Sequence, residues 1–182
     1  MPLPSPDYRE AERWLLSREL FGMRFGLDRM RRLLTVLGSP QRAFRTIHIV
    51  GTNGKSSVTR FASALLAAEG LRAGAYTSPH LVRFGERIQI EGREIDDATF
   101  ADAVARVRRA TAIVERSLDE GDRVTQFEAL TAVAFFVLAE ARVEVAAIEA
   151  GLGGRFDATN VIDSEVQVLT SVGLEHTRWL GP

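Results

Sequence analysis

The chain has 182 residues, of which 46% are hydrophobic and 26% are charged, which suffices for one ordinary globular core but not for two full domains. Its net charge of −1 provides no basic field, which argues against nucleic acid and an anionic membrane as partners. The chain has no cysteine, which excludes disulfides, thiolate metal sites and a cysteine nucleophile, so any metal must be held by oxygen or histidine.

The amino-terminal segment predicts a proline-containing lead-in and then a helix over residues 8–21, with Asp7 as its cap. It lacks the basic and then apolar build of a secretion signal. The longest nearly apolar stretch, residues 129–139, is too short to cross a bilayer and is interrupted by Thr131. We therefore expect a cytoplasmic protein with no membrane partner.

Four short apolar runs alternate with helical patterns along the rest of the chain. The runs predict strands at residues 45–50, 72–77, 143–149 and 166–172. The patterns between them predict helices at residues 56–69, from Asp96 or Asp97 to Leu118, and at residues 126–140. Strands separated by helices of these lengths favour parallel pairing with right-handed crossovers. The expected fold class is therefore α/β, with a doubly wound and mainly parallel sheet.

The same patterns predict which residues share a face. On the helix at residues 56–69, one face collects Val58, Phe61, Ala62, Leu65 and Leu66. On the next helix, the buried side is expected to hold Phe100, Ala103, Val104, Val107, Thr111, Val114 and Leu118, with Arg106, Arg109 and Arg116 turned outward. Residues 87–90 and 93–95, joined around Gly92, predict a small hairpin outside the sheet.

Lys55 is the only lysine in a chain that has 22 arginines, and it lies in the glycine-containing segment 51–57, directly after the first predicted strand. In a phosphate-binding loop, glycines let the backbone approach the phosphates, the next helix directs its amides at them, and a compact ammonium neutralises charge. The wide guanidinium group of arginine does not replace that point charge. Because Ile49 stands where the full Walker pattern has glycine, the segment is a shortened variant of this P-loop. A glycine-rich turn without a ligand is the alternative.

Polar residues follow each of the four predicted strands. They form the segments 51–57, 77–80, 149–157 and 175–176. Because parallel strands end at the same edge of a sheet, we expect these segments to line one ligand-binding crevice. Ser78, Glu149 and His176 would bring to it a hydroxyl, a carboxylate and an imidazole, which is a ligand set suited to Mg²⁺ or Mn²⁺.

Each of these three residues also has an interpretation without a metal. A carboxylate after a buried strand requires a partner, which for Glu149 could be a helix terminus or a basic side chain instead of a cation. The Thr-Ser-Pro sequence around Ser78 is also common in turns. A single histidine such as His176 is more often a core or loop residue than a ligand.

Six segments resemble folylpolyglutamate synthase and dihydrofolate synthase, which belong to the Mur ligase family of ATP-dependent amide-forming enzymes. They occur in the order seen in that family, at residues 51–57, 77–81, 86–88, 127–128, 149–160 and 176–181. The Gly-Thr-Asn-Gly-Lys loop indicates only the wider Mur ligase group. The Thr-Ser-Pro-His and Gly-Leu-Gly-Gly-Arg-x-Asp-Ala-Thr-Asn segments are typical of the folate branch, and the resemblance covers residues 26–182.

The resemblance implies that L-glutamate is ligated in two steps. ATP phosphorylates a carboxylate, either of dihydropteroate or of the terminal glutamate of a folate, and the amine of L-glutamate then attacks the acyl phosphate. By the same resemblance, the ATP phosphates are held by Thr52, Asn53, Gly54, Lys55, Ser56 and Ser57. Mg²⁺ is then assigned to Ser78, Glu149 and His176, and catalytic roles to Lys55, Glu149 and His176.

The resemblance also implies a site for the pterin or folate. Its residues would be Thr125, Gln126, Phe127, Glu128, Arg155, Phe156 and Asp157. In this site Phe127 would offer an aromatic face, and Asp157 a carboxylate for the amino and N–H donors of the ring. The pocket would be closed by Gly22, Met23, Arg24 and Phe25. The expected partners are therefore small molecules, and we expect the enzyme to be a monomer.

Two positions and the carboxyl end depart from the family pattern. Ser56 replaces glycine or threonine and keeps a hydroxyl, whereas Glu175 replaces an aspartate and adds a methylene beside His176. We expect residues 1–182 to form an amino-terminal ATP-binding domain that is incomplete at its carboxyl end. No helix is predicted after the fourth strand, and without one a face of the parallel sheet that is normally buried would be uncovered. The family's carbamylated-lysine segment and second domain are not in this chain, so we expect no turnover from these residues alone.

Two other functions fit the same residues. A P-loop phosphotransferase or small NTPase would release phosphate without requiring both a pterin substrate and glutamate. A nucleotide-binding remnant would bind the nucleotide and catalyse nothing.

Overall fold

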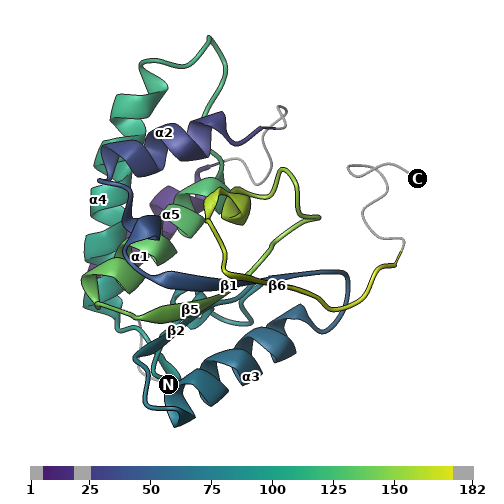
Figure 1. Ribbon diagram of the computed structural model, residues 1–182. Coiled ribbons are helices and arrows are strands. Elements are labelled where there is room, and N and C mark those ends of the chain that lie inside the picture. The colour runs from purple at the N-terminus through teal and green to yellow at the C-terminus, as the bar shows by residue number, and fades with distance from the viewer. Residues whose placement is uncertain (1–5, 19–25, 174–182) are drawn as a thin grey trace.

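The computed structural model describes residues 6–18 and 26–173, in which six strands form one sheet (Figure 1). The strands are β1 (Arg45–Val50), β2 (Ala73–Tyr76), β3 (Ile88–Ile90), β4 (Arg93–Glu94), β5 (Val145–Glu149) and β6 (Val166–Leu169). Their order across the sheet is β4-β3-β2-β5-β1-β6. All four strands predicted from apolar runs are present, and β1 has the predicted bounds.

The helices of the described residues cover both faces of this sheet. They are α1 (Pro6–Leu16), α2 (Asp28–Val36), α3 (Lys55–Ala68), α4 (Asp97–Glu115) and α5 (Gln126–Glu140), with the short 3-10 helices η1 (Pro40–Arg42), η2 (Phe84–Arg87) and η3 (Ala158–Val161). Figure 1 shows α3 on one face and α1, α2, α4 and α5 on the other. This arrangement confirms the doubly wound α/β class. None of these helices combines the length and the hydrophobicity that crossing a membrane requires.

The strands β2, β5, β1 and β6 are parallel neighbours, so their carboxyl ends lie at one edge of the sheet. In register, Ile49 of β1 pairs with Glu149 of β5, and Val50 pairs with Leu169 of β6. From β1 the chain crosses over β5 to reach β2, whereas from β5 it crosses over β1 to reach β6. The direction of crossover therefore reverses at the boundary between β1 and β5, and open α/β sheets bind ligands at such a point.

The predicted hairpin exists, but its expected position outside the sheet was wrong. Strand β3 pairs antiparallel with β2, with Tyr76 opposite Ile88, and β4 pairs with β3 at the sheet edge. The physical reason is that β2 would otherwise present unpaired backbone amides and carbonyls along its outer side. The hairpin satisfies those groups and extends the sheet.

The main core lies on the face of the sheet that α5 covers, and it extends to α1, α2 and α4. The predicted buried side of α4 is confirmed, except that Leu118 lies beyond the helix and is only half-buried, and the three arginines predicted to point outward are exposed. Helix α5 has the predicted bounds and is buried on nearly all sides. It begins with a capping box in which Thr125 Oγ1 accepts from Glu128 N at 3.2 Å and Glu128 Oε2 accepts from Thr125 N at 2.8 Å.

The first helix is shorter than predicted. Helix α1 ends at Leu16 instead of residue 21, and Asp7 lies within its first turn instead of capping it. The carboxylate of Asp7 is still well placed, because the first turn of a helix favours negative charge.

Only part of the predicted apolar face of α3 is covered, because Val58, Ala62 and Leu66 are half-buried whereas Phe61 and Leu65 are exposed. The residues of α3 that are buried against the strands are Thr59 and Ser63, whereas Phe61 and Leu65 are 69% and 68% exposed. Small side chains let the helix approach β1, β2 and β5 closely, and residues two positions away point to the opposite side of a helix. The hydrophobic pattern therefore predicted the helix correctly but did not identify Thr59 and Ser63 as its most buried residues.

This exposure leads to a prediction about stability. Changing Phe61 and Leu65 to serine in the 182-residue chain is expected to alter its free energy of unfolding by less than about 0.5 kcal/mol for each residue, because neither side chain is buried. The control is Leu138→Ala in the core, which is expected to destabilise by about 2–5 kcal/mol. Urea unfolding measures both. Losses at Phe61 and Leu65 as large as that of the control would show that this face is packed.

Candidate nucleotide-binding site

The lysine-bearing loop joins the end of β1 to the start of α3. Gly54 caps the helix with φ 84°, a left-handed conformation that glycine adopts without strain, and Lys55 is the first helical residue. The ammonium of Lys55 donates to the carbonyl oxygens of Gly51 at 2.6 Å and Thr52 at 3.1 Å. Ser56 and Ser57 follow in the first turn, where free backbone amides and the helix dipole favour an anion. The loop thus has the geometry of a phosphate cradle.

The residues that follow β6 hold this loop in place. Ser171 accepts from Thr52 N at 2.8 Å through its carbonyl oxygen and from Asn53 N at 3.1 Å through its hydroxyl. Gly51 has φ 131°, and a methyl group there would lie 2.3 Å from Thr170 Oγ1. Glycine is therefore required at position 51 both for its backbone angle and for space. Sequence reasoning did not identify Ser171, because its role depends on the pairing of β6 with β1.

Glu149 lies at the end of β5 and faces the loop. Its Oε1 accepts from Ser56 Oγ at 2.9 Å, and its Oε2 accepts from Ser78 N at 3.1 Å. The residue is only 1% exposed, and this burial raises the pKa of its carboxyl, although the hydrogen bonds from Ser78 and Ser56 and the charges of Lys55 and Arg60 act in the opposite direction. Ser56, Ser78 and Glu149, which come from three segments, thus meet at the predicted edge.

The oxygen atoms of this cluster fit a hard divalent cation. Glu149 offers a carboxylate held in place by two hydrogen bonds, and Ser56 brings a hydroxyl to the same position. Ser78 contacts Glu149 through its backbone amide. The third predicted ligand, His176, lies outside the described residues, and among those described no group of three or more His, Cys, Asp or Glu side chains is arranged to hold a metal. Of the three proposed magnesium ligands, Ser78 and Glu149 therefore lie together, and His176 is outside the described residues.

The glycine-rich segment after β5 is built around Asp157. Its Oδ2 accepts from Leu152 N at 2.7 Å, while its Oδ1 accepts from Thr159 N at 3.0 Å, so Asp157 both closes the loop and caps η3. Phe127 packs on the neighbouring Gly151, where an added methyl group would lie 2.4 Å from Phe127 Cζ. Phe127 and Asp157, two residues of the predicted pterin site, are therefore organised by adjacent residues of one loop.

Three other residues of the predicted pterin site are engaged with the protein itself. Thr125 and Glu128 form the capping box of α5, and Gln126 Nε2 donates to Leu15 O at 3.1 Å. Glu128 also pairs with Arg29, through Arg29 Nη2 at 3.2 Å. These contacts give Thr125, Gln126 and Glu128 structural roles, and their contact with a pterin stays a prediction.

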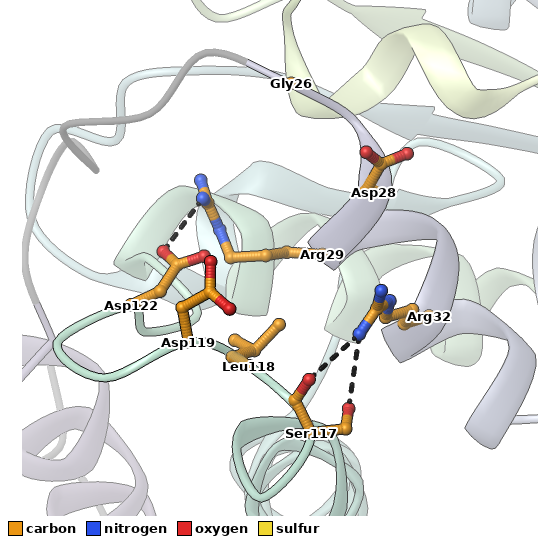
Figure 2. Close-up of a pocket in the computed structure, with 8 residues that line it drawn as sticks. All are labelled: Gly26, Asp28, Arg29, Arg32, Ser117, Leu118, Asp119 and Asp122. Carbon is orange, nitrogen blue, oxygen red and sulfur yellow. Dashed lines mark hydrogen bonds and ion pairs between the residues drawn. The ribbon is translucent and has the colours of Figure 1, made fainter.

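Arg29 also lines a cavity of about 230 Å³ between the start of α2 and the segment that joins α4 to α5 (Figure 2). In this cavity Arg29 Nη1 lies 3.0 Å from Asp122 Oδ1, and Arg32 Nη1 donates to the carbonyl oxygen of Ser117 at 3.1 Å. None of the eight lining residues belongs to the predicted site. Among the described residues, the Arg29–Glu128 ion pair at the start of α5 connects the cavity to the predicted site.

The remaining predicted residues are exposed or lie outside the described part. Arg155 and Phe156 are exposed, with the guanidinium carbon of Arg155 5.4 Å from the centre of the Phe156 ring. Residues 22–25, which were predicted to close the pterin pocket, are outside the described residues. Their assignment stays a prediction.

The parallel sheet, the glycine loop with its lysine and the buried carboxylate at the switch point are typical of P-loop α/β nucleotide-binding proteins. No family model matches the chain. Among curated proteins, the chain is 38% identical over 175 residues to the dihydrofolate synthase/folylpolyglutamate synthase of Bacillus subtilis, covering 96% of this chain and 40% of that protein. It is 42% identical over 160 residues to the enzyme of the same name from Mycobacterium tuberculosis, covering 85% and 33%.

The solved structures that resemble this chain come from the same group of enzymes. Folylpolyglutamate synthase of M. tuberculosis complexed with ADP and AMPPCP superposes with a TM-score of 0.88 at 40% identity, over 97% of this chain and 38% of that one. Escherichia coli FolC in complex with DHPP and ADP superposes with a TM-score of 0.86 at 33% identity, over 100% and 42%. The chain is thus homologous to the amino-terminal part of folylpolyglutamate and dihydrofolate synthases and spans 33% to 42% of their length.

Proposed function

We propose that this chain supplies the ATP-binding part of an enzyme that ligates L-glutamate to dihydropteroate, to the terminal glutamate of a folate, or to both. The observation that carries the proposal is the meeting of the Lys55 loop with Glu149, Ser56 and Ser78 at the switch point of the sheet. The relatives support it, since their solved complexes contain ADP, AMPPCP and DHPP. Small molecules are the partners that this reaction requires.

The proposed reaction has two balanced steps. A carboxylate oxygen of the pterin substrate attacks the γ-phosphorus of ATP, the bond to the bridging oxygen breaks, and ADP leaves. The amine of L-glutamate then attacks the acyl carbon, loses a proton, and expels inorganic phosphate as the amide forms. Lys55 and the amides at the start of α3 offset the negative charge of the transferring group, so the protein acts by positioning and electrostatics.

Mg²⁺ would be held by Glu149 with Ser78 and His176, and it would neutralise charge on the phosphate oxygens. Glu149 suits this role because its carboxylate is buried and oriented by hydrogen bonds before any ligand arrives. Burial raises its pKa, and a nearby cation would favour the ionised form. Phe127 and Asp157 are proposed to contact the pterin ring, since both adjoin the loop after β5.

The test is the substrate dependence of phosphate release by the protein that carries this chain. We expect release of phosphate from ATP only when a pterin substrate and L-glutamate are both present, together with a product heavier by one glutamyl residue. Dihydropteroate and tetrahydrofolate, supplied separately, distinguish the two activities. Release of phosphate from ATP alone would instead identify a P-loop NTPase, and nucleotide binding without any release would identify a non-catalytic protein.

A further inference from the structure

A buried histidine in β1 is connected to the loop after β5. His48 is 2% exposed, and its Nε2 lies 2.8 Å from the hydroxyl oxygen of Thr159. That hydroxyl lies 2.6 Å from Asp157 Oδ1, and Thr159 is itself fully buried. A polar side chain in the middle of a parallel sheet requires such a partner, because burying it without one costs about 1–3 kcal/mol.

The direction of these hydrogen bonds follows from the number of protons available. An ionised carboxylate only accepts, so the single hydroxyl proton of Thr159 is donated to Asp157. The hydroxyl oxygen must then accept from His48, which places the ring proton on Nε2. Burial lowers the pKa of His48, although the charge of Asp157 opposes this effect, and the neutral ring is sufficient for the hydrogen bond.

The same connection reaches the residues proposed to bind the pterin. The second carboxylate oxygen of Asp157 accepts from Leu152 N at 2.7 Å, and Leu152 follows Gly151, on which Phe127 packs. His48 lies on the strand that leads directly into the Lys55 loop. A continuous set of hydrogen bonds thus joins the strand before the phosphate loop to the loop after β5.

We propose that His48 is a positioning residue that, through Thr159, fixes the carboxylate of Asp157 and the backbone of residues 151–157 for the pterin substrate. This role rests on the proposed function. His48 contacts no substrate in this scheme. Its contribution is orientation, since a carboxylate with both oxygens held in place needs no reorganisation when a ring with N–H donors binds.

Variants of His48 and Thr159 in the protein that carries this chain separate positioning from simple packing. His48→Leu and Thr159→Val remove the hydrogen bond at similar volume. We expect each to raise KM for the pterin substrate about tenfold, the effect of losing one net hydrogen bond, with KM for ATP changed less than about twofold. His48→Gln carries an amide N–H that can reach Thr159, and Thr159→Ser keeps the hydroxyl, so both should stay near the wild-type values.

A second measurement does not depend on activity. Hydrogen exchange of the Leu152 amide, which Asp157 protects, is expected to quicken in His48→Leu and Thr159→Val but not in His48→Gln or Thr159→Ser. Folded variants in which neither the exchange of Leu152 nor KM for the pterin changes would overturn the positioning role. A wild-type enzyme without pterin-dependent phosphate release would overturn the proposed function instead, and the exchange rates would still decide whether His48 positions the loop.

Discussion

Replacing Lys55 by alanine is expected to remove most of the turnover of the protein that carries this chain while leaving its fold intact. Lys55 is half-buried, and its ammonium donates hydrogen bonds to two carbonyl oxygens of its own loop, so little of the core depends on it. Each charge-assisted hydrogen bond to a phosphate contributes about 1.5–3 kcal/mol, which corresponds to roughly a tenfold to more than a hundredfold loss of kcat/KM per bond. Steady-state kinetics measure the loss, and circular dichroism checks the fold.

Lys55→Arg is the matched variant, because it keeps the charge and changes its shape. We expect it not to restore turnover, because the compact ammonium donates to the carbonyl oxygens of Gly51 and Thr52 and a planar guanidinium places its charge and its donors differently. Near-native activity in the arginine variant would contradict the argument that the loop requires a point charge. The other basic positions of the chain hold 22 arginines and no lysine, so the sequence uses arginine wherever a positive charge alone is sufficient. A failure of Lys55→Arg would therefore point to the shape of the group and not to its charge.

Changing Glu149 to glutamine is expected to weaken binding of the magnesium–nucleotide complex by at least about tenfold and yet to stabilise the protein without ligand near neutral pH. The amide has the same shape, and its oxygen and nitrogen can still bond to Ser78 N and Ser56 Oγ. The substitution removes a buried negative charge. That charge is proposed to bind the cation, and in the protein without ligand its burial is destabilising.

The sign of the pH dependence follows from the raised pKa of Glu149. Because the folded state binds this proton more tightly than the unfolded state, the stability it contributes is fully present below the unfolded pKa of about 4.5 and is lost as the pH rises through the folded pKa. The glutamine variant lacks this loss. Its stability relative to wild type should therefore increase between pH 4.5 and neutrality. Denaturant unfolding at several pH values measures the difference, and a variant that is less stable at pH 7 than at pH 5 relative to wild type would contradict it.

The sheet and the helix α5 could be predicted from the sequence because their signals are local. Helix α5 is bounded by a capping box at Thr125 and Glu128, and the apolar runs of β1 and β5 are ended by a glycine loop and by Glu149. Parallel pairing then follows from the lengths of the connections, which is why the meeting of Ser56 with Glu149 was predictable. The burial of Thr59 and Ser63 on α3 was not predictable, since hydrophobic periodicity predicts the helix but not the small polar residues that pack on the strands.

The residues that sequence reasoning missed are those whose partners are far along the chain. Helix α2 was not predicted, and its Arg29 pairs with Glu128, which is 99 positions away. His48 and Thr159 are 111 positions apart. A signal for His48 was available, because a polar residue inside a buried apolar strand requires a partner, but the sequence does not say which. Such pairs become visible only when the sheet is assembled.

The most direct test of the proposed reaction follows an oxygen atom. The protein that carries this chain is given ATP, L-glutamate and a pterin substrate whose reacting carboxylate is labelled with ¹⁸O, and the inorganic phosphate is analysed by mass spectrometry. An acyl phosphate formed at the Lys55 loop transfers one labelled oxygen to each phosphate released, because the acyl carbon keeps only one of its two carboxylate oxygens when the amide forms. Unlabelled phosphate would mean that water attacks the nucleotide, and the ligase assignment would be wrong.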